Sequence, residues 1–162
     1  MVRRRIVAGL GAAAMAVGLW AGVAGAHEPT PTGNQGCTPG FWKNNLIAWE
    51  STAPNVYDPN QTLGSVFANV PAQYADKTLL EALNFPGYLG ADARLLKHAT
   101  AALLNASHFD VAYQVGNDAV IKFFVAIVLK FGTAEQKDEL KNVFDAWNNG
   151  VGGCPLAANV DY

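Results

Sequence analysis

The sequence is poor in the residues and motifs that usually carry catalysis. Its 162 residues include two cysteines, three histidines and three serines. None of the serines (Ser51, Ser65 and Ser107) lies in the strand-turn-helix elbow that exposes a nucleophilic serine. The chain also lacks a glycine-rich phosphate loop. These absences favour a non-enzymatic protein without a cofactor, and they leave the catalytic residues of any enzyme unknown.

Basic charge is scarce once the N-terminus is set aside. Residues 1–26 predict a secretory signal peptide, with three arginines, an uncharged apolar stretch and the small residues Ala24-Gly25-Ala26 before cleavage at His27. Its removal leaves eight Lys and Arg against thirteen Asp and Glu, a formal net charge of −5. Nucleic acids and anionic membranes bind basic surfaces, so we expect neither as a partner.

The same stretch has a competing interpretation as a permanent membrane span, because it just reaches the necessary length. Its glycines and its small-residue exit favour cleavage. We therefore expect a secreted protein with no stable membrane span after cleavage, and the arginine-led, alanine-rich signal indicates a bacterial source.

The only two cysteines, Cys37 and Cys154, bracket nearly all of the residues that are expected to fold. An even number of cysteines in an exported chain favours a disulfide over two free thiols. We therefore expect one disulfide that joins the two ends of the domain. The expected organisation is a signal peptide at 1–26, a flexible tail at 27–36, a helical domain at 37–156 and a C-terminal tail at 157–162.

No run of alternating apolar and polar residues is long enough for a sheet, so the chain is expected to be all-α. Capping residues precede four of the expected helices: Thr38 with Pro39, Thr78, Asn117 or Asp118, and Thr133. The helical stretches predict a single bundle of five or six helices clasped by the disulfide. The run 120–131 is apolar nearly all round, which predicts the central buried helix.

The opening segment Gly36-Cys37-Thr38-Pro39-Gly40-Phe41-Trp42-Lys43-Asn44 resembles that of a group of secreted, mostly bacterial domains. These domains open with a GCTPG-aromatic-WK-N segment and close near a second cysteine. Residues 78–83, 98–105, 148–150 and 154–156 resemble the same group. The resemblance implies an exported, disulfide-closed domain and indicates no activity. Such sequences often carry histidine where this chain has Asn45.

Aromatic residues are densest near the opening segment, where Phe41, Trp42 and Trp49 are followed by Tyr57. Two tryptophans on one helical stripe are more typical of a core than of a ligand platform. If some of these rings are exposed, flat aromatic faces beside asparagine amides suit a sugar ring or a partner protein. The candidate ligand or partner surface is therefore Phe41, Trp42, Asn44, Asn45 and Tyr57, and the expected partner is a protein or carbohydrate of the cell envelope.

The histidines are the only candidates for a metal site. His27 would be the N-terminal residue after cleavage, where a terminal amine and a ring nitrogen together chelate copper, and His98 or His108 would have to complete the site. His98 and His108 do not share a face of a continuous helix, so we expect no metal site. Carboxylates such as Glu50 and Asp58 pair only if the fold brings them to one cleft.

These observations favour a secreted, non-enzymatic helical domain for binding, adhesion or cell-envelope structure. The alternative is an extracellular hydrolase or a copper-binding protein whose site is assembled only by the fold. An enzyme should show a pocket with two titratable groups within hydrogen-bond reach. A binding module should show exposed aromatic residues on a convex face or in a shallow groove.

Overall fold

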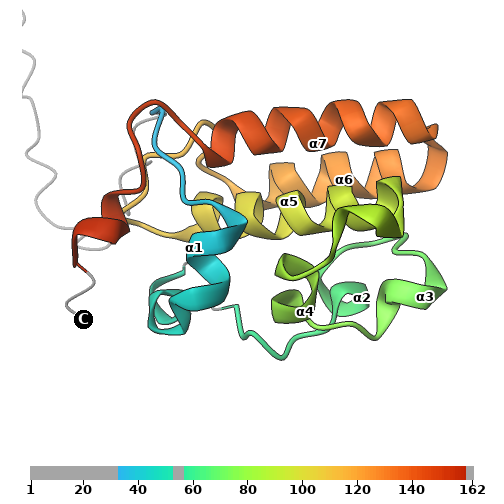
Figure 1. Cartoon of the computed structure of the whole chain (residues 1–162), viewed down its shortest axis with the longest axis horizontal. Helices are drawn as coiled ribbons and strands as arrows, with labels where there is room; N and C mark the ends of the chain where they lie inside the picture. Colours follow the sequence, from blue (N-terminus) through green and yellow to red (C-terminus); the bar gives the residue numbers. More distant parts are fainter. Residues whose placement is uncertain (1–32, 53–56, 160–162) are drawn as a thin grey trace, which may run out of the picture.

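The computed structural model describes residues 33–52 and 57–159, and helices are the regular secondary structure in this part of the chain (Figure 1). The α-helices are α1 (Pro39–Asn44), α2 (Leu63–Val66), α3 (Ala72–Ala75), α4 (Leu79–Leu83), α5 (Ala91–Ser107), α6 (Asp118–Phe131) and α7 (Ala134–Asn148). The 3-10 helices are η1 (Leu46–Ser51), η2 (Gly87–Leu89) and η3 (Pro155–Asn159). The described residues form two isolated β-bridges and no strand, which confirms the all-α class.

The described residues contain more helices than the five or six expected, because residues 63–83 form three very short ones. The predicted first helix also divides, since α1 ends at Asn44 and η1 begins at Leu46. No helix in the described ranges has the length and apolarity needed to cross a membrane. The predicted signal peptide and residues 27–32 lie outside those ranges.

The helix starts follow from local capping chemistry. The Thr38 hydroxyl accepts a hydrogen bond from the Phe41 backbone at 3.1 Å, with Pro39 at the first helical position. Thr78 and Glu81 form a reciprocal capping box at the start of α4, and Thr133 and Gln136 form another at α7. Asn117 caps α6 by accepting from the Ala119 backbone at 2.8 Å. These predicted caps are confirmed.

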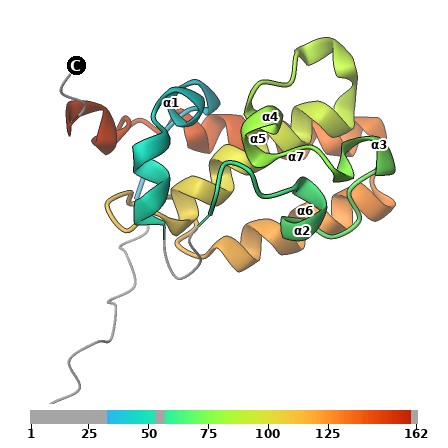
Figure 2. The same ribbon diagram turned by 90° about the horizontal axis from the view of Figure 1, so that it is seen from below.

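The central helix of the bundle is α5, whose alanines and leucines are buried along most of its length. Helices α6 and α7 lie beside it, and α1 and α4 cover its other side (Figures 1 and 2). The prediction that residues 120–131 form the central buried helix is wrong. Helix α6 buries only one face, which includes Ile121 and Val125, and its other face is open to solvent. Apolarity all round a helix does not by itself show burial all round.

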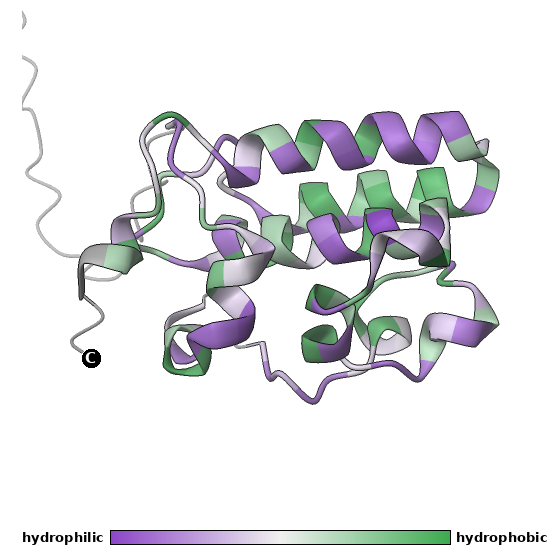
Figure 3. Cartoon of the chain, viewed as in Figure 1, coloured by the Kyte–Doolittle hydropathy of each residue, from purple (hydrophilic) through white to green (hydrophobic). Residues whose placement is uncertain are grey.

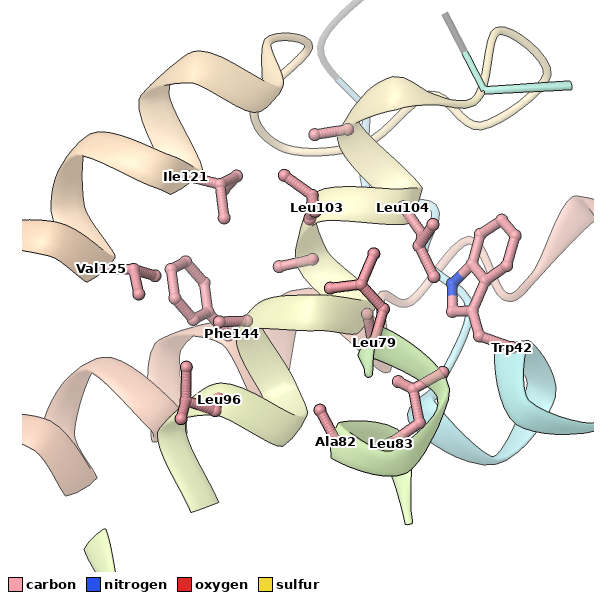
Figure 4. Close-up of a cluster of buried hydrophobic side chains, with 14 of the residues drawn as sticks. Trp42, Leu79, Ala82, Leu83, Leu96, Leu103, Leu104, Ile121, Val125 and Phe144 are labelled. Carbon is pink, nitrogen blue, oxygen red and sulfur yellow. The ribbon is translucent and has the colours of Figure 1, made fainter. Parts of the chain in front are cut away.

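The core fills the space between these helices. Figure 4 shows Phe144 of α7 beside Val125 of α6 and Leu96 of α5. At the other end of α5, Trp42 packs near Leu104 and the first turn of α4. Three long helices and one covering layer therefore share a single hydrophobic core.

The two ends of the domain are joined as expected by the disulfide between Cys37 and Cys154. Four residues of the predicted flexible tail, 33–36, belong to the folded domain. The Gln35 amide donates to Ala112 O at 3.2 Å, and the Gly36 amide donates to Gly153 O at 3.1 Å. Gly36 is required here, because a Cβ would collide with the Trp147 carbonyl.

Candidate functional site

The predicted aromatic surface near the first helix is largely internal. Trp42 is completely buried and its Nε1 donates to Asn105 Oδ1 at 3.2 Å, while Tyr57 is only 4% exposed. Phe41 is half-buried with its ring edge-on to Trp42. Trp42 and Tyr57 therefore offer no face to a ligand, and that part of the prediction is wrong.

Of the two asparagines predicted beside this cluster, Asn44 is exposed and Asn45 is half-buried. The Asn45 side chain donates to the Phe41 carbonyl at 2.8 Å, so it closes the C-terminal end of α1. Of the five residues predicted to form this surface, Phe41, Asn44 and Asn45 reach solvent. They include one aromatic ring, so they do not form a platform of flat rings. This arrangement does not favour a sugar ring.

Tyr57 and Asp118 form a buried polar pair with Lys122. The Tyr57 hydroxyl donates to Asp118 Oδ2, and Lys122 Nζ lies 3.0 Å from the same carboxylate oxygen and 3.1 Å from the phenol oxygen. Burial, and then the hydrogen bond to Asp118, raise the pKa of Tyr57. Burial lowers the pKa of Lys122, but its hydrogen bonds to Tyr57 and Asp118 outweigh that effect and raise it. The Lys122 ammonium is therefore held charged and the Tyr57 phenol protonated, and their hydrogen bonds hold Tyr57 against α6.

A second polar cluster, which the sequence did not predict, lies at the centre of the fold. The Asn105 side chain accepts from the Cys37 amide at 2.9 Å and donates to the Cys37 carbonyl at 2.9 Å. Its Nδ2 also donates to Asn148 Oδ1 at 2.9 Å, and Asn148 Oδ1 accepts from the Tyr113 hydroxyl at 2.8 Å. All three side chains are buried. Buried polar groups with complete hydrogen bonding fix one arrangement of a core, so this cluster is structural.

His98 and His108, the two histidines that the structure describes, belong to no cluster of metal-ligating side chains. His98 lies on α5 with its Nδ1 3.4 Å from Asp145, while His108 is the C-cap of α5 and stacks on Phe109. Burial lowers the pKa of each, against the opposing effects of nearby Asp145 and Asp110. The described ranges contain no group of three or more metal-ligating side chains. His27 lies outside the described residues.

Two of the carboxylates named from the sequence, Glu50 and Asp58, do line one hollow. This hollow measures about 360 Å³ and is shared with Leu46, Ile47, Trp49, Tyr57 and Pro59. Ile47 and Leu46 are exposed at its edge. Two acidic residues that are eight positions apart in the sequence thus line the same hollow.

An exposed apolar surface follows the outer side of α6. Phe123, Phe124, Ile127 and Phe131, which we call the α6 ridge, are 61%, 48%, 41% and 73% exposed. In Figure 3 the ribbon of α6 is green over most of its length, whereas α7 alternates between polar and apolar residues. Apolar patches of about 300–600 Å² on monomeric proteins are often functional.

A shallow groove of about 450 Å³ runs between the α6 ridge and α7. Val128, Leu140 and Val143 supply its apolar lining together with ridge residues, and Gln136 and Glu139 stand at its α7 side. On the other side, Lys130 Nζ lies 5.0 Å from the centre of the Phe131 ring. An apolar floor between a few polar residues is typical of a protein-binding surface.

No protein-family model matches the chain, and comparisons with curated proteins and with solved structures find no significant match. The groove could not have been predicted, because the signal of an apolar α6 is the same for a buried helix and for a binding surface.

Proposed function

We propose that this chain is a secreted, non-enzymatic helical domain that binds protein through the α6 ridge and the adjoining groove. Its role is binding, adhesion or cell-envelope structure, outside a bacterial cell. The single observation that supports this most is the row of exposed phenylalanines along one face of a helix whose opposite face is anchored in the core.

A protein partner agrees better with this surface than a carbohydrate does. Sugar sites combine a flat aromatic ring with several polar side chains, whereas the groove is lined mainly by apolar side chains. The ridge residues lie at positions 123, 124, 127 and 131, the spacing of one helical face. Such a stripe packs against another helix or an apolar protein surface.

The test is binding of the mature, disulfide-bonded protein to an isolated envelope fraction and to the other secreted proteins of its source. We expect Phe131→Glu to reduce binding at least about tenfold, because the new carboxylate would be buried without a partner. The matched control is Tyr88→Glu, since Tyr88 is an aromatic residue on η2 that is 85% exposed and lies outside the groove.

Equal loss of binding in both variants would contradict the proposal, because it would show a general effect of charge. Equal binding of all three proteins would contradict it as well. Circular dichroism and thermal unfolding confirm that each variant is folded before binding is compared.

The hollow that contains Glu50 and Asp58 supports a second candidate function, an extracellular hydrolase. Paired carboxylates cleave glycosidic bonds when one acts as an acid and the other as a base or nucleophile. A screen against cell-wall polysaccharides, repeated with Glu50→Gln and Asp58→Asn, tests this function. Turnover that both substitutions abolish would establish the enzyme, and absence of turnover in the native protein would remove it.

A further inference from the structure

We infer that the partner of the α6 ridge is a second copy of this chain, paired across a two-fold axis at Ile127. This inference rests on the proposed function, because it takes the ridge as a protein-binding surface and names what binds there. Three properties of the ridge support it: the symmetry of its sequence, its area and its charge.

The ridge sequence is partly symmetric about Ile127. Phe123 and Phe131 lie four residues before and after Ile127, and Phe124 and Lys130 lie three residues before and after it. In a two-fold dimer of antiparallel helices, a residue on one flank of the patch meets the residue at the opposite height on the same flank. Phe124 and Phe131 lie on the same flank of Ile127, so antiparallel α6 helices centred on Ile127 place Phe124 of one copy against Phe131 of the other.

The area is sufficient for the centre of a specific interface. If a whole phenylalanine side chain offers about 200 Å², the three ridge phenylalanines together expose about 360 Å². Two copies would then cover about 700 Å² of aromatic surface, and the surrounding rim would bring the total towards the 1,200–2,000 Å² that is typical of stable interfaces. The groove beside Phe131 accommodates the phenylalanine of the second copy that lies opposite.

The charges are compatible with this pairing. Lys130 is the only charged residue next to the ridge on the exposed side of α6, and it already lies over an aromatic ring. In the antiparallel register, Lys130 meets Phe123 of the second copy, which lies on the same flank of Ile127, and a cation over a ring is favourable there. Glu135 and Glu139 of α7 lie beyond the ridge, where a polar rim is expected.

The oligomeric state is measured by sedimentation equilibrium of the mature, disulfide-bonded protein from low micromolar to submillimolar concentration. We expect a reversible monomer–dimer equilibrium. Phe131→Glu should raise the dimer dissociation constant more than about tenfold, because it buries a carboxylate opposite Phe124 of the second copy. Tyr88→Glu should leave the constant unchanged, since Tyr88 lies outside the ridge.

Cysteine cross-linking tests the register. Ile127→Cys should form a disulfide-linked dimer rapidly under mild oxidation, because the two-fold axis passes beside this residue. Ala119→Cys, also exposed on α6, should not, because its two copies would lie about 24 Å apart along the paired helices. A mixture of Phe124→Cys and Phe131→Cys should cross-link to each other faster than either does to itself.

A protein that is monomeric at every concentration would overturn the inferred dimer. Equal cross-linking rates of the Ile127→Cys and Ala119→Cys variants would overturn the two-fold register centred on Ile127. Envelope binding that Phe131→Glu abolishes in a monomeric protein would overturn only the dimer and leave the proposed function standing. Dimerisation in the predicted register supports the inference whether or not an envelope partner is found.

Discussion

Asn105 joins three parts of the fold that are far apart in the sequence. It satisfies both backbone groups of Cys37, holds the Trp42 indole at 3.2 Å and contacts Asn148 at the end of α7. The disulfide, the first helix and the last helix are thus positioned by one amide on α5. This role could not be predicted from the sequence, because an asparagine in an alanine-rich helix has no local feature that identifies partners many residues away.

Replacement of this amide should be severe. Asn105→Ala leaves the Cys37 backbone and the Trp42 indole buried without partners, and each unsatisfied group costs about 1–3 kcal/mol. We expect the free energy of unfolding to fall by about 3 kcal/mol or more in urea denaturation. Asn142→Ala, an exposed substitution on α7, is the control. A loss below about 1 kcal/mol for Asn105→Ala would show that the cluster does not stabilise the core.

The buried histidines should make stability depend on mild acid. Burial lowers the pKa of His108 in the folded protein below its ordinary value of 6.5, so the unfolded chain binds the proton first as pH falls. The stabilising contribution of neutral His108 is therefore complete above about pH 6.5 and is lost as the pH falls below that value. The lowered pKa of His98 acts in the same direction.

His108→Asn should reduce this dependence when urea denaturation is compared at about pH 7 and pH 5. Asparagine can still accept from the Asp110 amide, as His108 Nδ1 does at 3.2 Å, so the local turn is kept. Identical pH dependence in the native protein and the variant would contradict the assignment of this effect to His108.

At the scale of the helices, sequence reasoning succeeded wherever the signal was local. The Thr38, Thr78, Asn117 and Thr133 caps lie where they were predicted, because a cap depends on residues within one turn. The prediction that α6 is the central buried helix was wrong. A helix that is apolar on every side carries no information about which side is buried, and only its packing on α5 decides it.

The two faces of α6 should respond differently to substitution. Ile121→Ala removes a buried side chain and should cost about 2–5 kcal/mol. Phe123→Gln changes an exposed ring and should alter the free energy of unfolding by no more than about 0.5 kcal/mol at low protein concentration. Chemical denaturation of both variants distinguishes this packing from a fully buried α6, in which both substitutions would be strongly destabilising.

Across the whole molecule, the disulfide between Cys37 and Cys154 joins the two ends of the fold, and the proposed binding surface is the α6 ridge. The disulfide joins positions 117 residues apart, and residues 33–36 pass between the loops at 111–113 and 150–153 next to it. The pairing of the cysteines was predictable, because an exported chain with two cysteines has one choice. The packing of residues 33–36 was not, because their Gly-rich composition is equally typical of a tail.

Loss of the disulfide should lower stability without changing the fold. A closed loop of 117 residues corresponds to about 4–5 kcal/mol in the chain-entropy model. We expect the Cys37→Ser/Cys154→Ser double variant to unfold at much lower urea concentration than the native protein and to keep its helical circular dichroism. A double variant as stable as the native protein would show that the polar cluster at Asn105 holds the ends together unaided.

Whether the α6 ridge is a contact surface is tested most directly by carbene footprinting of the mature protein, read by mass spectrometry at increasing protein concentration. Labelling of Phe123 and Phe131 should be high in dilute solution and should fall together as concentration rises, while labelling of Tyr88 stays constant. Ridge labelling that remains as high as that of Tyr88 at every concentration, and with the envelope fraction added, would contradict a binding role for this face.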